Sequence, residues 1–187
     1  MDGILDNNIV LESVKDNNYL VNSAIKGSKE DFISLIDIYK EYLYKTAFLY
    51  VKDENYASDI YQETIYKAYL GIAKLKKPEF FKTWITKILI NTAKDKLKEI
   101  KKEVTSIKLE ECLSVSINES ISIEEKIDLY DAIDCLNEKY KTPIILKYFH
   151  DMSIKEISKT LDTKENTVKS LIHRGKAILL NNLKGDL

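Results

Sequence analysis

The stretch SIKEISKTLDTKENTVKSLIHRGKAIL, residues 153–179, places hydrogen-bonding and cationic side chains at helical spacing after a short break. It contains the only arginine in the chain. Amide, hydroxyl and cationic groups in such a row can contact base edges and phosphates. The polar positions are Asn166, Thr167, Lys169, Ser170, His173 and Arg174. The pattern favours contact with nucleic acid, and the alternative is an ordinary helical hairpin with a solvated outer face.

Two short helices must position this row. Ser153 is a natural N-cap, and Glu156 three residues later predicts a capping box. A break at 162–164 separates this first helix from the second. The inward residues of the second helix are Val168, Leu171, Ile172, Gly175, Ile178 and Leu179. The spacing is that of a helix-turn-helix, whose second helix enters the major groove of DNA.

Charge is strongly segmented along the chain although the net charge is only −1. Residues 26–102 carry sixteen lysines against eleven acids, and residues 139–187 carry ten basic residues against five acids. Residues 103–138 carry two lysines against ten acids. Basic blocks suit contact with phosphates, and a solvated lysine-rich face is the alternative for either block.

Apolar periodicity predicts helices on both sides of a linker. The first long helix spans about 29–51, with Ser28 and Asp31 as a capping-box-like pair. A short helix around 19–26 precedes it. The other predicted helices span about 55–74, one opened by Pro78, 123–136 and 143–149, before the helix-turn-helix.

The predicted fold is therefore all-α, with two helical domains joined by a flexible acidic linker and a helix-turn-helix in the second domain. The linker is rich in Ser, Glu and Asn and keeps no apolar period. The predicted boundaries are an N-terminal extension at 1–18, a first domain at 19–100, a linker at 101–122 and a second domain at 123–187.

Composition excludes several classes of protein. The chain is 44% apolar and 32% charged, and it has no apolar run near the roughly 18 residues that a membrane span needs. The N-terminus has no secretory signal pattern, so we expect a cytoplasmic protein that is not itself a membrane protein. Cys112 and Cys135 are predicted to be ordinary thiols. The sequence has no glycine-rich phosphate loop and no cluster of residues at metal-ligand spacing. We therefore expect no enzymatic activity, no metal and no cofactor.

Longer strings resemble bacterial sigma factors. The string YKTPIILKYFHDMSIKEISKTLDTKENTVKSLIHRGKAIL resembles their fourth region. LVNSAIKGSKEDFISLIDIYKEYLYKTAFLYV, DIYQETIYKAYLGI and FFKTWITKILINTAKDKLK resemble the second region of the extracytoplasmic-function (ECF) group. The resemblance covers Tyr19 to Leu183 except the linker, and it looks closest to a SigV-like subgroup of Gram-positive bacteria.

The resemblance implies a protein that is not an enzyme. It would bind bacterial core RNA polymerase, recognise the −35 and −10 promoter elements and hold the opened −10 strand. It would serve an envelope-stress regulon and be held inactive by an anti-sigma protein, a class often anchored in the membrane. The alternative is a helix-turn-helix regulator that acts without docking on polymerase.

The resemblance also implies three sets of contact residues. For core polymerase the set is Asp59, Ile60, Gln62 and Glu63. For the −10 strand the set is Lys74, Lys76, Lys77, Phe80, Lys87, Asn91, Lys94 and Lys98. For the −35 element the set is Lys164, Glu165, Asn166, Thr167, Lys169, Ser170, His173 and Arg174. A merely solvated acidic edge remains the alternative for the polymerase set.

Individual residues refine these expectations. Phe81 and Trp84 lie on the inward stripe and are expected in the core, which leaves Phe80 as the aromatic for the strand. His150 and Met152 are expected to be structural. Three positions depart from the family pattern: Lys98 and Leu171 stand where arginine is usual, and the RAR-like triplet is Arg174, Gly175, Lys176. Lysine cannot make the bidentate fork of arginine, so base preference cannot be copied from the family.

Overall fold

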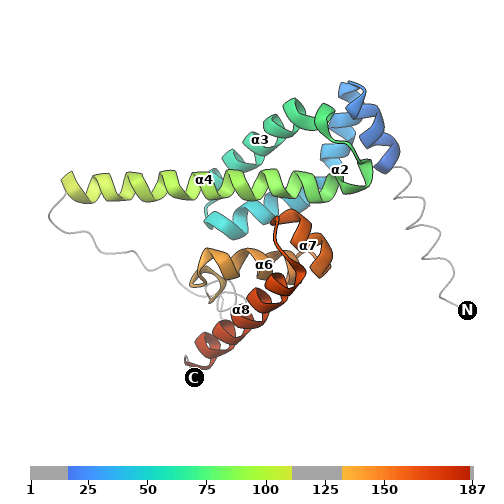
Figure 1. The fold of residues 1–187 in the computed structure, drawn as a ribbon. Coiled ribbons are helices and arrows are strands. Elements are labelled where there is room, and N and C mark those ends of the chain that lie inside the picture. Colours follow the sequence, from blue (N-terminus) through green and yellow to red (C-terminus); the bar gives the residue numbers. More distant parts are fainter. Residues whose placement is uncertain (1–16, 111–131, 186–187) are drawn as a thin grey trace, which may run out of the picture.

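The computed structural model describes residues 17–110 and 132–185, and within these ranges every regular element is helical (Figure 1). This confirms the predicted all-α class. The elements are a helix over 17–25, α2 (Lys29–Val51), α3 (Glu54–Gly71), the 3₁₀ turns η1 (Ile72–Lys74) and η2 (Pro78–Phe80), α4 (Phe81–Glu110), a helical turn over 132–134, α6 (Glu138–Tyr148), α7 (Ile154–Thr160) and α8 (Glu165–Gly185).

The helices α2, α3 and α4 form the N-terminal unit, and α2 begins where its cap predicts. The Asp31 amide donates to Ser28 Oγ over 3.2 Å. The Asp31 carboxylate accepts from Ser23 of the preceding helix, so the pair is an N-cap without the reciprocal half of a capping box. Fully buried side chains from all three helices fill the core, including Leu35, Leu43, Ile60, Ile85 and Leu89.

The connection between α3 and α4 follows its sequence signals. The predicted helix over 55–74 is α3 followed by η1, and Pro78 opens η2 rather than α4 itself. Phe81 is buried, as expected, whereas Trp84 is half-buried. A Cβ on Gly71 would lie 3.3 Å from Trp84 Cζ2, so glycine permits the close packing of α3 against the indole.

The first part of the predicted linker is helical instead. The helix α4 continues to Glu110, beyond the predicted boundary at 101, and its C-terminal part projects from the bundle (Figure 1). Lysine and glutamate extend a helix well even where no apolar stripe requires it, so the loss of periodicity at 101 does not mark the end of this helix. Residues 111–122 of the linker and 1–16 of the N-terminal extension lie outside the described residues.

The helices α6, α7 and α8 form the C-terminal unit, around Ile144, Ile145, Leu146, Ile157 and Val168. The helix predicted to begin at Pro143 begins five residues earlier, at Glu138, and this prediction was wrong. Asn137 caps it: its Oδ1 accepts from the Lys139 amide over 3.2 Å. Burial of the residues around Pro143 holds this proline inside the helix, against its usual place in the first turn.

Two further predictions concern the same unit. The apolar spacing of 144, 145 and 148 predicts that Tyr148 faces inward, but it is 53% exposed, because the longer α6 places other residues on its buried side. In the helix predicted over 123–136, residues 132–134 are helical, and Ile133 and Leu136 are buried. The remainder of that helix, 123–131, lies outside the described residues.

Gly175 sets how closely α8 approaches α6. A Cβ at this position would lie 3.0 Å from Ile144 Cγ1 and 3.3 Å from Tyr140 Cβ. We expect Gly175→Leu to lower the free energy of unfolding by about 1–3 kcal/mol in urea titrations, because overpacking outweighs the helix propensity gained. The control Lys176→Leu changes an exposed neighbour and should stay within about 0.5 kcal/mol of wild type. Equal effects of the two variants would contradict this packing argument.

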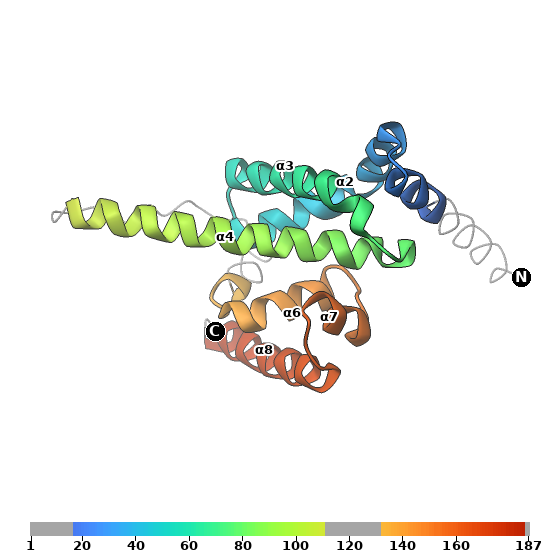
Figure 2. The same ribbon diagram turned by 45° about the horizontal axis from the view of Figure 1, so that its top comes forward.

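The two units pack against each other. Both views show the C-terminal unit along one side of α4, and α7 contacts α4 directly (Figure 2). The sequence patterns gave no indication of this contact. It places several of the predicted functional residues at a seam between the units.

Candidate nucleic-acid and partner-binding surfaces

The outer face of α8 and the turn before it carry the predicted −35 set. Its inner face buries Val168, Ile172, Gly175 and Leu179. As a consequence, every predicted residue on the other side is exposed. These are Lys164, Glu165, Asn166, Thr167, Lys169, Ser170, His173 and Arg174. The structure thus brings the whole set onto one accessible face.

The helix-turn-helix that presents this face is confirmed. The Glu156 amide donates to Ser153 Oγ over 3.2 Å, and the Ser153 amide donates back to Glu156 Oε2 over 2.8 Å, which completes the predicted capping box. The Ser153 hydroxyl bond lowers the pKa of Glu156. Asp162 in the turn has a left-handed backbone, with φ of 48°, a conformation that Asp and Asn tolerate better than most residues. The turn therefore fixes the angle at which α8 leaves α7.

The exposed side of α3 carries the predicted polymerase set. Asp59, Gln62 and Glu63 line one polar groove between α3 and α4. Asp59 pairs with Lys96 at 3.4 Å, and Glu63 pairs with Lys67 at 3.4 Å. Both acids remain open to solvent, so a partner can reach them.

Ile60 differs from the other members of this set because it is buried. Its side chain is only 1% exposed, because it points into the core between the helices of the N-terminal unit. The inward stripe of α3 already required this, since Ile60 is three residues after Ala57 and four before Thr64. Ile60 borders the polar groove from beneath, and its role in polymerase contact stays a prediction.

Sequence reasoning missed an apolar groove beside the polar one. Gln62 lines both grooves, and the second is formed with Phe32, Ile33, Tyr66 and Tyr69. The signal was present, because positions 66 and 69 follow Gln62 at spacings of four and seven. Sequence reasoning also missed Lys67 and Lys96. The pair of Lys67 with Glu63 requires a defined helix face, and the pair of Lys96 with Asp59 requires the packing of α4 against α3.

The predicted −10 set divides into a loop group and a helix group. The loop lysines Lys74, Lys76 and Lys77 are exposed. Phe80 was expected to be exposed but is half-buried. The reason is a cation from the other unit: Lys159 Nζ lies 3.9 Å from the Phe80 ring centroid.

On α4, the helix group is partly occupied by the C-terminal unit. Asn91 and Lys98 are exposed, and Lys98 pairs with Asp95, also on α4, at 3.2 Å. Lys87 instead pairs with Asp162 of the helix-turn-helix turn, and Lys94 pairs with Glu138 of α6 at 2.9 Å. These two lysines therefore lie between the units rather than on an open face.

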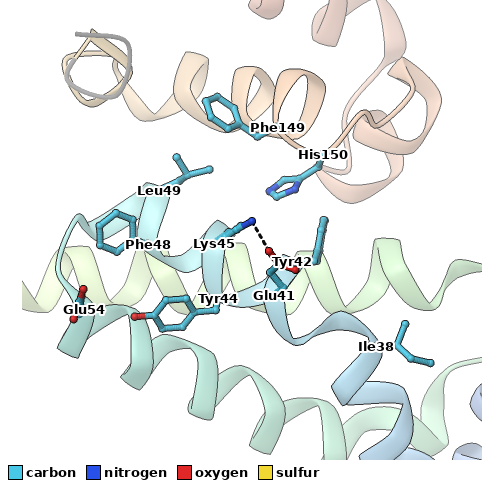
Figure 3. Close-up of a pocket in the computed structure, with 10 residues that line it drawn as sticks. All are labelled: Ile38, Glu41, Tyr42, Tyr44, Lys45, Phe48, Leu49, Glu54, Phe149 and His150. Atoms are coloured by element: carbon cyan, nitrogen blue, oxygen red, sulfur yellow. Dashed lines mark hydrogen bonds and ion pairs between the residues drawn. The ribbon is translucent and has the colours of Figure 1, made fainter. Parts of the chain in front are cut away.

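His150 and Met152 occupy the structural positions that were expected. Met152 is buried. Figure 3 shows His150 beside Tyr42 in a groove of about 720 Å³ along α2, and the two ring centroids are 4.3 Å apart. Thr46 Oγ1 donates to the Tyr42 carbonyl over 2.6 Å, so its 2.7 Å bond to His150 uses the same oxygen as acceptor and the Nε2–H as donor.

Acidification should destabilise this fold through His150. Burial, and then the nearby Lys82 charge, lower the pKa of His150 from 6.5 to about 4. Between these values the unfolded imidazole takes up a proton and the folded one does not, so stability falls as pH falls below 6.5. We expect the free energy of unfolding to fall by about 1–2 kcal/mol between pH 7 and 5. This figure is reduced to allow for the partial exposure of His150 to solvent.

Urea unfolding at pH 7 and pH 5 measures this effect, and His150→Gln is the control because it cannot titrate. Some carboxyl groups, including those of Asp31 and Glu156, have lowered pKa values. Their contribution to the stability of the fold is lost only at lower pH. If wild type and His150→Gln lose the same stability between pH 7 and 5, the prediction fails.

Comparisons with known proteins follow the same division into two units. The family model "Sigma-70 region 2" matches residues 35–103, and "Sigma-70, region 4" matches residues 126–179. The RNA polymerase sigma factor SigV of Bacillus subtilis is 36% identical over 160 residues, covering 81% of this chain and 90% of that protein. The ECF RNA polymerase sigma factor SigW of the same organism is 30% identical over 183 residues, covering 88% and 95%. The chain belongs to the ECF sigma factors.

Solved structures agree with the fold of this sigma factor. CnrH, solved in complex with the cytosolic domain of CnrY, matches with a TM-score of 0.71 at 19% identity, covering 92% of this chain and 99% of that one. The sigma factor RpoE of Bartonella quintana matches with a TM-score of 0.68 at 22% identity, covering 84% and 99%. As a sigma factor, the protein is a transcription initiation factor and not an enzyme. Across 17–110 and 132–185, no helix is long and apolar enough to span a bilayer.

Proposed function

We propose that this sigma factor docks on bacterial core RNA polymerase through the polar face of α3 and reads the −35 element with the outer face of α8. Asp59, Gln62 and Glu63 are the polymerase contacts in this proposal. The observation that carries it is the separation of a buried face and a polar, exposed face on α8. Val168, Ile172, Gly175 and Leu179 are buried on one face, and all eight proposed DNA-contacting residues are accessible.

The chemistry of the α8 face suits duplex DNA. Asn166 and Lys169 can donate to base edges, and Glu165 can accept from cytosine. Arg174 provides the only guanidinium in the chain, at a position nearer the phosphates. The exposed N-terminal end of α8 is the part of a recognition helix that reaches the bases.

For the −10 element, we propose that the η1–η2 loop and α4 hold the opened strand. Lys74, Lys76 and Lys77 supply positive charge along the exposed loop. Phe80 follows them and can stack on an unpaired base once Lys159 moves away. Asn91 and Lys98 continue the surface along α4.

Regulation by an anti-sigma protein is proposed from the solved relatives. RpoE of Bartonella quintana was solved with the anti-sigma factor NepR. We propose that a protein of this class, which can be membrane-anchored, binds the present chain in the cytoplasm. We also propose an envelope-stress regulon, on the strength of the likeness to ECF factors.

Run-off transcription with bacterial core polymerase on a panel of promoter fragments tests the proposal. Specific transcripts should appear only when the protein is present. If core polymerase gains no transcript and does not bind the protein, while the protein alone shifts duplex DNA, the independent helix-turn-helix regulator replaces this proposal.

A further inference from the structure

We propose that Asn166 selects an adenine in the −35 element, through the two hydrogen bonds that its side-chain amide can make to adenine N6 and N7. This inference rests on the proposed function, because it assumes that the outer face of α8 enters the major groove of promoter DNA. It deepens that function by naming a specificity-determining residue and the base that it selects.

The position of Asn166 on α8 is the first observation. The buried positions of this helix are 168, 172, 175 and 179. Successive residues of a helix turn by about 100°, so positions 166, 170, 173 and 177 lie opposite the buried side, and all four are exposed. Asn166 is the first of them along the chain and the second residue of α8. Because the N-terminal residues of a recognition helix contact the base edges, Asn166 is the best placed of this stripe.

The Asn166 amide is also available for a base. The helix start is closed by Lys164, whose carbonyl accepts from the Val168 amide over 3.1 Å. Within residues 17–110 and 132–185, no hydrogen bond to the Asn166 side chain competes with a base. The amide therefore offers a donor and an acceptor side by side. Adenine presents the complementary pair, an acceptor at N7 and a donor at N6, whereas guanine presents two acceptors.

The neighbours of Asn166 have less selective chemistry. The Ser170 hydroxyl can donate or accept, so it suits any base. Lys169 is a point charge that a phosphate can also satisfy. Arg174 lies eight residues, or about 12 Å, further along the helix axis, on a flank beside half-buried Leu171. In residues 165–171, Asn166 is therefore the only side chain that carries a donor and an acceptor on separate atoms in one rigid plane.

The surroundings allow the approach to DNA. Figure 2 shows α8 on the side of the C-terminal unit away from α4, with α6 and α7 between them. Lys164 and Lys169 precede and follow Asn166, and both are exposed. Phosphate contacts of this kind fix the register of a recognition helix, and a base contact then confers selectivity.

Replacement of single base pairs in a promoter tests the assignment. The strongest fragment of the run-off panel is used, and each base pair of its upstream half is changed in turn to the other three. Run-off transcription is measured with core polymerase at limiting sigma factor. With wild type, we expect one position where adenine gives roughly five- to 150-fold more transcript than any other base. With Asn166→Ala, the preference at that position alone should fall to within about twofold.

Two further variants distinguish a base contact from a loss of structure. Asn166→Arg presents a guanidinium at the same place, so the preference at that position should move from adenine to guanine. The matched control is Asn181→Ala, which removes an exposed asparagine from the same helix about 22 Å further along its axis. Its base preferences should equal those of wild type.

A modified base separates direct contact from DNA shape. The analogue 7-deazaadenine lacks the N7 acceptor but keeps its Watson–Crick pairing. At the selected position it should lower transcription by wild type roughly two- to tenfold and leave transcription by Asn166→Ala unchanged. An equal loss with both proteins would show that adenine acts through the shape of the DNA, and this result overturns the inference.

The outcomes separate the two proposals. Base preferences that Asn166→Ala leaves unchanged, in a protein that transcribes normally, overturn the inference and leave the proposed function intact. Loss of a preference for a base other than adenine also overturns it. If no fragment of the panel yields a transcript, the proposed function fails and the inference fails with it.

Discussion

Alanine at both Asp59 and Gln62 is expected to reduce transcription by at least tenfold at limiting sigma factor. Both side chains are exposed on α3 and line the polar groove, and Gln62 also borders the apolar groove beside it. Truncating two central contacts of an interface typically costs about 2–4 kcal/mol together, or roughly 30- to 1,000-fold in affinity for core polymerase. The fold should survive, because the exposed pair between Asp59 and Lys96 contributes little.

Two measurements check this expectation: run-off transcription over a titration of the variant, and the dissociation constant for core polymerase. The matched control is Ser34→Ala with Asp37→Ala on α2. It removes one neutral polar and one acidic side chain, both exposed, at the same spacing of three. If the two double variants bind polymerase with equal affinity, the polar face of α3 does not form part of the polymerase interface.

Ile157→Ala is expected to lower the stability of the helix-turn-helix by about 2–5 kcal/mol. Ile157 is completely buried in α7 and shares the core of the C-terminal unit with Val168 and Ile144. Alanine would leave a cavity beneath the recognition helix, which the short α7 can close only in part. Transcription from a promoter that depends on its −35 element should fall with this loss.

Urea unfolding followed by circular dichroism measures the stability change. Leu180→Ala is the control, because Leu180 is a large apolar residue on α8 that is exposed, and its loss should stay within about 0.5 kcal/mol. Binding to core polymerase through α3 provides the second control, since it should be retained by Ile157→Ala. A variant as stable as wild type would show that the α7 core is not needed.

Local signals predicted the helices that carry their own start sites. Ser28 before α2 and Ser153 before α7 both cap the helix where expected, because capping depends on residues within one turn of each other. The accessible face of α8 was equally predictable, since its inner stripe has a clear helical period.

Predictions failed where packing overrides a local preference. Pro143 was interpreted as a helix start, yet buried neighbours keep it inside α6. Ile60 was grouped with its exposed neighbours although its own position on α3 faces the core. The burial of Ile60 can be predicted from the helical stripe that it shares with Ala57 and Thr64. The residues that hold Pro143 inside α6 lie elsewhere in the chain, and local sequence does not identify them.

The contact between the units was beyond sequence reasoning for a related reason. Periodicity shows which side of α4 is apolar, but it does not show what covers the polar side. Lys87 and Lys94 have the spacing of DNA-facing residues, and nothing in the sequence next to them indicates Asp162 or Glu138 as partners. Their roles in DNA binding stay predictions.

The contact between the two units combines polar and apolar groups. Thr46, Thr142 and Lys141 form hydrogen bonds across it, and the groove beside them is lined by Ile38, Phe48, Leu49 and Phe149. Separating the units would therefore expose apolar as well as polar groups to water. Exposure of apolar groups raises the heat capacity, so the contact between the units contributes to the heat-capacity change of unfolding.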